Sequence, residues 1–192
     1  MSRWNDEQRI ANERQLGNVR AAIMSRTQAL SSSPSAHVVP ASADGSLRLV
    51  ASRSFSIGES ILTVDGVIQS VPSRYSIQIG IDQHVEQPSA TTRDQERLRY
   101  PWRFLNHACA PNASLHGRDL RALRAIDEGE EITFDYLTTE FEMATPFRCA
   151  CGASSCQGEI RGFRHLSAEQ RARYVPRTAA HVLALARRHG LI

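Results

Sequence analysis

Apolar and polar positions alternate in short runs between residues 37 and 86, and turn residues separate the runs. The runs read SLRLVASR, SIGESILTVDG, VIQSVPS and YSIQIGIDQHVE. β-Branched residues fit a pleated, half-buried surface. Turn signals about every 8–12 residues are typical of all-β domains. The pattern therefore predicts small antiparallel sheets instead of a parallel sheet built from β-α-β units.

Helical patterns flank this region on both sides. Residues 5–30 carry apolar side chains at helical spacing, interrupted at Gly17, and the serine-rich residues 31–36 predict a linker. Residues 165–192 predict two helices, and the second begins after Pro176. It ends in Arg187, Arg188 and His189 before Gly190, which is the order typical of a helix C-terminus.

The middle of the chain holds a short helix and an acidic stretch. Residues 94–107 begin with a helical pattern that Pro101 keeps short. Residues 120–136 predict two strands joined by a turn at 127–130. Residues 127–142 contain seven acidic side chains and no basic one, mostly typical of a solvated turn. Within this stretch Glu140 could attract a cationic peptide, although an exposed charge contributes little.

Composition narrows the class of protein. The 192 residues are 41% hydrophobic and 22% charged, with a net charge of +3, which is ordinary for one globular domain with extensions. No dense basic block indicates direct nucleic-acid binding. No apolar run approaches the roughly 18–20 residues that cross a bilayer, and the polar N-terminus is not a secretory signal. These features predict a cytoplasmic protein with reduced thiols; they say nothing about its oligomeric state.

All 23 basic residues are arginine, and lysine is absent. GC-rich codon usage would explain this bias. An enzyme that acts on lysine would also gain from offering none of its own, and the sequence does not separate the two explanations.

The four cysteines form a pattern that suits a metal. Cys149, Cys151 and Cys156 lie within eight positions, and Cys109 is the only other cysteine. Tetrahedral zinc takes four thiolates, and Gly152 permits a sharp turn after the closely spaced pair. Four protein ligands leave no place for a reacting water, so such a zinc ion would be structural. Disulfides, and inert or redox-active thiols, are the alternatives.

Several motifs resemble one enzyme family. RFLNHACAPN (103–112) and GEEITFDY (129–136) resemble the two signatures of SET-domain lysine methyltransferases. CACGASSCQG (149–158) is similar to the post-SET motif of that family, whose cysteines share a zinc ion with the cysteine of the first signature. ASRSFSIGESI (51–61) resembles an early strand pair of the family.

The resemblance implies a mainly β fold, a β-clip of small antiparallel sheets with a pseudoknot, and a division of the chain into four parts. These are an N-terminal helical extension and linker (1–36), a SET domain (37–147), a post-SET zinc segment (148–164) and C-terminal helices (165–192). It also implies S-adenosylmethionine as cofactor and a structural zinc ion. The expected function is N-methylation of lysine side chains in a protein or peptide. Two alternatives stay open: a SET-like enzyme for a small-molecule amine or with non-standard cofactor use, and a non-catalytic zinc-containing binding module.

The resemblance also assigns roles to single residues. Tyr136 would be the catalytic tyrosine, and Phe134, on the same strand face, would limit the number of methyl groups that the substrate pocket admits. The cofactor would contact Asn106 and His107. The remaining assignments are Arg103, Phe104 and Tyr75 on the cofactor side, Glu140 in the substrate pocket, and Cys109, Cys149, Cys151 and Cys156 on the metal.

One departure concerns the cofactor. The family carries a Gly-x-Gly motif where this chain has Ser46 and Arg48. Glycines there let the backbone approach the cofactor, whereas an arginine side chain could obstruct it. Gly45 could compensate through a shift of one residue.

Overall fold

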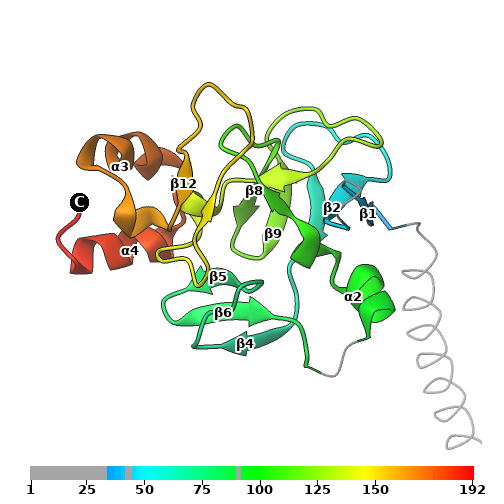
Figure 1. The fold of residues 1–192 in the computed structure, drawn as a ribbon, viewed down its shortest axis with the longest axis horizontal. Coiled ribbons are helices and arrows are strands. Elements are labelled where there is room, and N and C mark those ends of the chain that lie inside the picture. Colours follow the sequence, from blue (N-terminus) through cyan, green and yellow to red (C-terminus); the bar gives the residue numbers. More distant parts are fainter. Residues whose placement is uncertain (1–33, 42–44, 90–91) are drawn as a thin grey trace, which may run out of the picture. The chain divides into compact units, whose positions relative to one another are not determined.

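Twelve short strands in the described residues form five small sheets (Figure 1). Six of them lie between residues 36 and 86, where the alternating pattern predicts strands. The structure is a computed structural model, and it describes residues 34–41, 45–89 and 92–192. The helix expected within residues 5–30 and most of the linker lie outside this described part. Residues Ser35–Ile192 form one compact unit. The strands are β1 (Ala36–Pro40), β2 (Leu47–Ala51), β3 (Ser60–Thr63), β4 (Val67–Gln69), β5 (Ile77–Gly80), β6 (Gln83–Glu86), β7 (Asn106–His107), β8 (Ala113–His116), β9 (Asp119–Ala122), β10 (Thr133–Phe134), β11 (Phe147–Arg148) and β12 (Glu159–Ile160).

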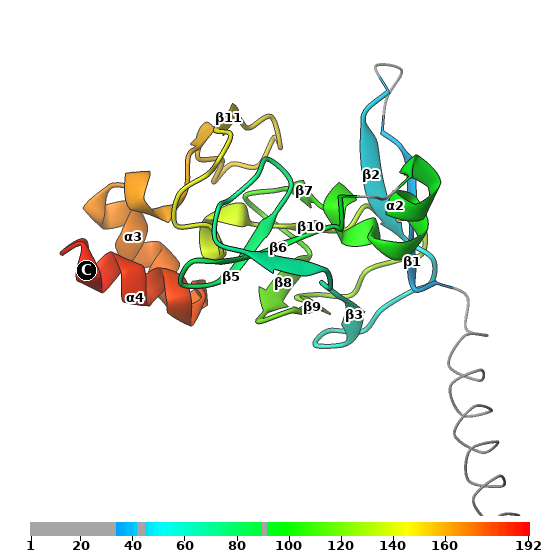
Figure 2. The ribbon, with the colours of Figure 1, turned by 90° about the horizontal axis from the view of Figure 1, so that it is seen from below.

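Four of these sheets are antiparallel and one is parallel. The antiparallel sheets have the orders β1-β2, β3-β9-β8, β4-β6-β5 and β11-β12. The parallel sheet consists of β7 and β10, which are far apart in sequence and lie side by side (Figure 2). This architecture confirms the expected mainly β fold class.

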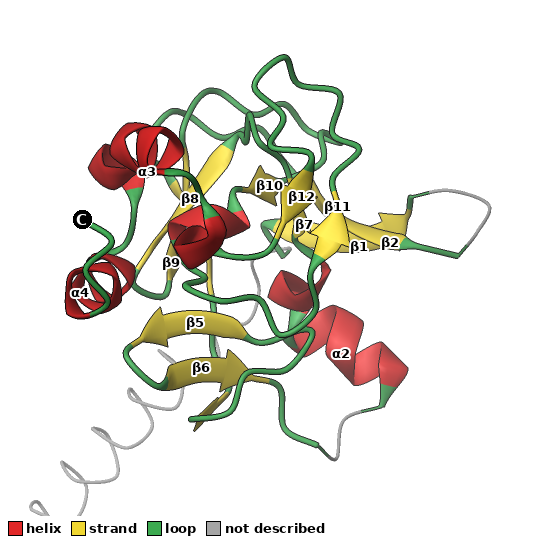
Figure 3. Cartoon of the chain, turned by 60° about the vertical axis from the view of Figure 1, so that its left-hand side comes forward, coloured by secondary structure: helices red, strands yellow, loops and turns green. Residues whose placement is uncertain are grey.

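The helices are short and lie outside the sheets (Figure 3). They are α2 (Arg93–Arg99), α3 (Ala168–Tyr174), α4 (Ala180–Arg188) and the 3-10 turns η1 (Pro101–Phe104), η2 (Tyr136–Thr138), η3 (Phe163–His165) and η4 (Val175–Arg177). Thr92 and Ser167 begin α2 and α3 with capping boxes, and α2 ends before Pro101 as expected. No helix within the described ranges is long and apolar enough to cross a membrane.

The segment 120–136 differs from the predicted pair of joined strands. β9 pairs with β3 and β8, whereas β10 pairs with β7 in another sheet. The turn forms at Gly129, which has a φ of 79°, but the chain then crosses to a different sheet. Ile126 and Ile132 are both fully buried; Ile126 exchanges two backbone hydrogen bonds with Phe55, and the Ile132 N–H donates to the Leu49 carbonyl. Burial of these two side chains therefore outweighs the local tendency to form a hairpin.

Two apolar clusters stabilise the described unit, and Tyr136 packs against both. The first fills the space between the sheets around Trp102, which is 1% exposed. The second joins the C-terminal helices to Cys109, Leu137 and Phe163. Tyr136 therefore lies where the two clusters meet.

Candidate active site and metal centre

The parallel pairing of β7 and β10 brings the two sequence signatures together. Asn106 pairs with Thr133 and His107 pairs with Phe134. Buried Asn112 links the same segments, because its amide donates to the Glu131 carbonyl at 2.8 Å and its Oδ1 accepts from the Thr133 backbone at 2.9 Å. The two signature segments are therefore held side by side by backbone pairing and by one buried amide.

Tyr136 follows β10 immediately, at the start of η2. Its hydroxyl donates to the Leu105 carbonyl at 2.5 Å. Its ring lies 4.8 Å from the Phe134 ring and 5.3 Å from the His107 ring, measured between centroids. Burial raises the pKa of Tyr136, so the hydroxyl stays protonated at neutral pH. Phe134 and Tyr136 do not share a strand face, because the strand ends at Phe134, but their rings are adjacent.

His107 is held neutral inside this arrangement. Its Nδ1 accepts from the Tyr136 backbone N–H at 3.2 Å, and its Nε2 lies 3.2 Å from the Cys109 Sγ. Burial lowers the pKa of His107 to about 4. Asn106 is fixed from the other side, since its amide donates to Glu131 Oε1 at 2.8 Å and to the Leu47 carbonyl at 3.3 Å.

Two neighbouring hollows meet at Tyr136. The first is a wide cleft of about 870 Å³, within the range of roughly 300–1,000 Å³ that is typical of small-molecule sites. The second is a narrow cavity of about 50 Å³ that includes Phe134, Trp102 and Glu140. Six residues line both: Arg74, Tyr75, Arg103, Leu105, Tyr136 and Met143.

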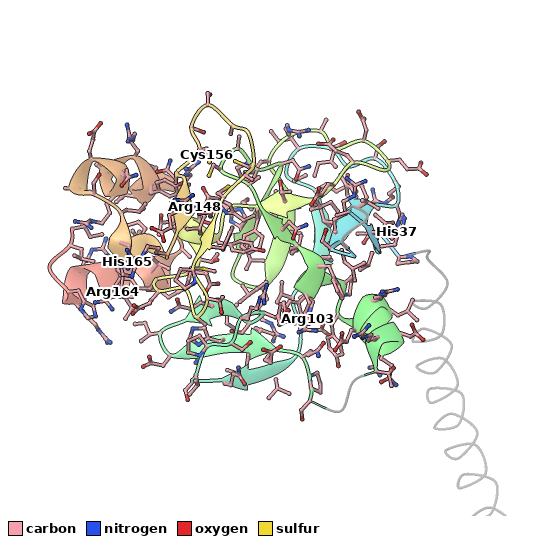
Figure 4. All side chains as sticks on the ribbon, in the orientation of Figure 1. His37, Arg103, Arg148, Cys156, Arg164 and His165 are labelled. Carbon is pink, nitrogen blue, oxygen red and sulfur yellow. The ribbon has the colours of Figure 1, made fainter. Side chains whose placement is uncertain are left out.

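The expected cofactor residues separate into two groups. Asn106, His107, Tyr75 and Arg103 line the wide cleft. Phe104 lies in η1 and lines neither hollow. The Arg103 guanidinium lies 4.5 Å above the Tyr75 ring and 3.3 Å from Glu96, next to α2 (Figure 4). The buried Arg103 Nε has no hydrogen-bond partner within the part of the chain that the structure describes.

Arg48 does not obstruct the cleft. Its guanidinium points to Glu131, at 3.7 Å, and Arg48 is not among the residues that line the wide cleft. Ser46 does line it. The cleft therefore stays open despite the missing Gly-x-Gly motif. Its arginines, tyrosine and Asn106 offer donors and stacking surfaces that fit a nucleoside with a carboxylate.

Glu140 is not the exposed charge that its acidic surroundings suggest. It is 6% exposed, and its Oε1 accepts from the Gln78 backbone N–H at 2.8 Å. Burial raises the pKa of Glu140 to about 7. The expectation of a solvated surface charge is therefore wrong, since the chain after η2 packs against β5 instead of turning into solvent.

The four cysteines converge as the spacing predicts. Their Sγ atoms all lie within 4.8 Å of one another, and those of Cys109 and Cys149 are 3.9 Å apart. A tetrahedral zinc ion with Zn–S bonds of about 2.3 Å separates its sulfurs by about 3.8 Å, so the donor set fits zinc. Gly152 makes the expected turn with a φ of 71°. None of the four cysteines forms a disulfide. Cys156 lies in the loop before β12 (Figure 4).

Several residues of the site carry no strong sequence signal. Arg74, Met143 and Phe147 line the wide cleft, and Gln78 braces Glu140. Arg74 and Met143 lie outside the strands, whereas Phe147 belongs to β11 and Gln78 to β5. Residue type alone indicates little about which of these side chains face the cleft. For Glu140 the acidic stretch indicates an exposed position, whereas the assignment to the substrate pocket agrees with its place in the narrow cavity.

Comparisons with known proteins find relatives for part of this chain. A family model described as SET domain matches residues 4–137. Methyltransferase flvH of Aspergillus flavus is 33% identical over 75 residues, which are 37% of this chain and 42% of that protein. Histone-lysine N-methyltransferase ash1 of Drosophila melanogaster is 35% identical over 77 residues, which are 36% of this chain and 4% of that protein. The chain thus spans less than half the length of these curated relatives.

Solved structures give a partial likeness. The methyltransferase domain of human Histone-lysine N-methyltransferase SETMAR has a TM-score of 0.46 and 19% identity, covering 65% of this chain and 57% of that chain. KRYPTONITE in complex with mCHG DNA and SAH has a TM-score of 0.46 and 20% identity, covering 64% of this chain and 28% of that chain.

Proposed function

We propose that this chain, which belongs to the SET-domain family, transfers methyl groups from S-adenosylmethionine to lysine side chains of a protein. One observation supports the proposal most directly: Tyr136 lines both the wide cleft, which has the size of a small-molecule site, and the narrow cavity, which has the size of an amine. In this reading, residues 37–147 are the SET domain, 148–164 the post-SET segment and 165–192 an appended helical part.

The residues of the wide cleft suit the cofactor. Asn106 and His107 would hold it from the β7–β10 side, and Arg103 and Tyr75 would hold it from the opposite side. S-adenosylmethionine supplies an electrophilic methyl group on a sulfonium sulfur. Phe104 is better regarded as a brace of η1, because it lines neither hollow.

The residues of the narrow cavity would orient the amine. Tyr136 stays protonated and donates to the Leu105 carbonyl, so its oxygen lone pairs can accept hydrogen bonds from an amine. Such positioning accounts for much of the rate in displacement reactions, because the lone pair must be aligned and free of water. Phe134 closes the cavity beside it and would limit the bulk of the amine.

Cys109, Cys149, Cys151 and Cys156 would hold a structural zinc ion. Cys149 and Cys151 also line the wide cleft. The ion would therefore fix one wall of the cofactor site without taking part in the chemistry.

Calorimetric titration with S-adenosylmethionine and S-adenosylhomocysteine, followed by a methylation assay, tests the proposal. Histone H3 peptides are the first substrates to try, because relatives are named histone-lysine N-methyltransferases. Free L-lysine serves as the small-molecule arm. The chain contains no lysine, so incorporated label cannot come from its own lysine side chains.

Tyr136→Phe should lower methyl transfer by about 10²–10³-fold, because the amine loses an orienting group. Cofactor affinity should stay within about twofold, and loss of the bond to Leu105 should cost about 1 kcal/mol of stability. A folded protein that binds neither nucleoside would favour the non-catalytic module.

A further inference from the structure

Glu140 is the single carboxylate among the residues that line the narrow cavity. The other charged side chains there are Arg74 and Arg103. Arg103 is already matched, since its guanidinium lies 3.3 Å from Glu96 and 3.8 Å from Glu86. Arg74 is exposed and stacks on Tyr75. The acidic group of the cavity therefore has no counter-ion within the described residues.

The carboxylate is anchored by one oxygen only. Oε1 accepts from the Gln78 backbone N–H at 2.8 Å, and the Gln78 side chain accepts from the Phe141 N–H at 2.9 Å. This reciprocal brace fixes Glu140 against β5. Within the described part of the chain, no hydrogen bond reaches Oε2. Glu140 is 6% exposed, yet Oε2 is not among the fully enclosed unpaired atoms, so this oxygen can still be reached. A largely buried carboxylate is costly unless a cation meets it.

The cavity has the size of an amine. A volume of about 10–15 Å³ holds one water-sized group, so about 50 Å³ admits an ammonium group with one or two methyl substituents. Phe134 and Trp102 provide an apolar wall around it. A cation that enters therefore loses most of its hydration and needs an anionic partner.

We propose that Glu140 binds the ammonium group of the substrate in the narrow cavity and accepts one of its protons before methyl transfer. This rests on the proposed function. The N–H bond breaks, the electron pair remains on nitrogen, and the proton forms an O–H bond on the carboxylate. The neutral amine, oriented by Tyr136, can then attack the methyl group, and the protonated Glu140 returns its proton to solvent.

The electrostatic surroundings suit a proton acceptor. Burial raises the pKa of Glu140 to about 7, and only hydrogen bonds from Gln78 and Thr139 oppose this shift. A carboxylate with a raised pKa accepts a proton from an ammonium group more readily than an ordinary one does.

Other titratable groups around Glu140 come from each neighbouring element. Tyr136 belongs to η2, and Arg103 to η1. His84 of β6 is the register partner of Gln78, and His181 of α4 bonds the Thr139 carbonyl. Burial lowers the pKa of both histidines, so they stay neutral near pH 7 and leave Glu140 as the group that titrates.

The test uses n-butylammonium as a probe of the cavity and n-butanol as its neutral counterpart, on the full chain with S-adenosylhomocysteine present. The wild type should prefer the ammonium about tenfold or more, as expected for a charge-assisted bond. Glu140→Gln keeps an oxygen for the Gln78 brace and should lose this preference. Glu142→Gln, at the neighbouring carboxylate paired with Arg164, should keep it.

A second measurement needs no variant. Between pH 8 and pH 6 the ionised fraction of a carboxylate with a pKa of about 7 falls about tenfold, and n-butylammonium affinity should fall with it. An affinity independent of pH, or a Glu140→Gln protein with unchanged preference, would overturn the inference. Failure to bind S-adenosylhomocysteine would instead count against the proposed function, and the probe can then be measured on the protein alone.

Discussion

The two walls of the wide cleft are built in different ways. One wall carries Asn106, His107 and Tyr136 and belongs to the sheets, where Trp102 and its neighbours are buried. The other carries Phe147, Cys149 and Cys151 and belongs to a segment whose regular structure is the two-residue pair of β11 and β12. Burial and strand pairing stabilise the first wall.

The second wall depends on its sulfur atoms. Residues 149–156 contain exposed positions and no fully buried side chain. Burial raises the pKa of the Cys109 thiol, so a thiolate there requires a nearby cation. We therefore expect burial and strand pairing to hold Tyr136, the proposed catalytic tyrosine, without metal, and we expect the wall at Cys149 and Cys151 to need a metal ion that joins the four cysteines.

Damage to the first wall should have the largest effect. Trp102→Ala removes a fully buried ring and its hydrogen bond to the Asp65 carbonyl, and should lower the free energy of unfolding by about 3–5 kcal/mol. Urea denaturation measures this loss. A cost below about 1 kcal/mol would show that the sheets do not depend on this cluster.

Damage to the second wall should be local. Cys149→Ser, or removal of metal by a chelator, should loosen residues 147–160 and weaken S-adenosylhomocysteine binding about tenfold, because the binding surface is no longer preorganised. Hydrogen exchange should increase in this segment and stay slow in β8 and β9. Ser154→Ala, at an exposed position of the same loop, is the control.

Glu140, which lines the narrow cavity, should have a smaller effect that depends on pH. Its folded-state pKa of about 7 lies above the ordinary value of 4.5, so the folded protein holds the proton more tightly than the unfolded chain. Stability should therefore fall as the pH rises from about 4.5 to about 7. Glu140→Gln should remove this fall and be about 1–3 kcal/mol more stable than the wild type at pH 8. Parallel pH profiles for the two proteins would contradict this.

Arg48→Ala should have the smallest effect. The side chain is partly exposed, forms a long ion pair with Glu131 and does not line the cleft. Stability should change by less than about 0.5 kcal/mol, and S-adenosylhomocysteine affinity by less than about twofold. Arg103→Ala is the contrasting variant, because Arg103 lines both hollows. This substitution should weaken S-adenosylhomocysteine binding about tenfold. Tighter S-adenosylhomocysteine binding by Arg48→Ala than by the wild type would instead show that the Arg48 side chain obstructs the cleft.

Much of the site follows from short-range chemistry. The cysteine spacing with Gly152 predicts a cluster of four sulfurs, and the structure brings their Sγ atoms within 4.8 Å. The alternating runs predict the small sheets. The arginine-glycine order predicts the end of α4, where His189 caps the helix and Gly190 has a φ of 63°. Apart from the approach of Cys109, which lies forty positions before Cys149, each of these depends on neighbours in sequence or on a backbone conformation that one residue type favours.

The remaining features depend on contacts between distant residues. The pairing of β10 with β7, the burial of Glu140 against Gln78 and the turn of Arg48 toward Glu131 all join positions more than twenty residues apart. Local propensity and ligand chemistry act on neighbouring residues, so the sequence predicts the strands of residues 37–86, the closely spaced Cys149, Cys151 and Cys156, and the family motifs. Which side chains face the cleft follows from the packed fold, because burial energy depends on the complete set of packed surfaces.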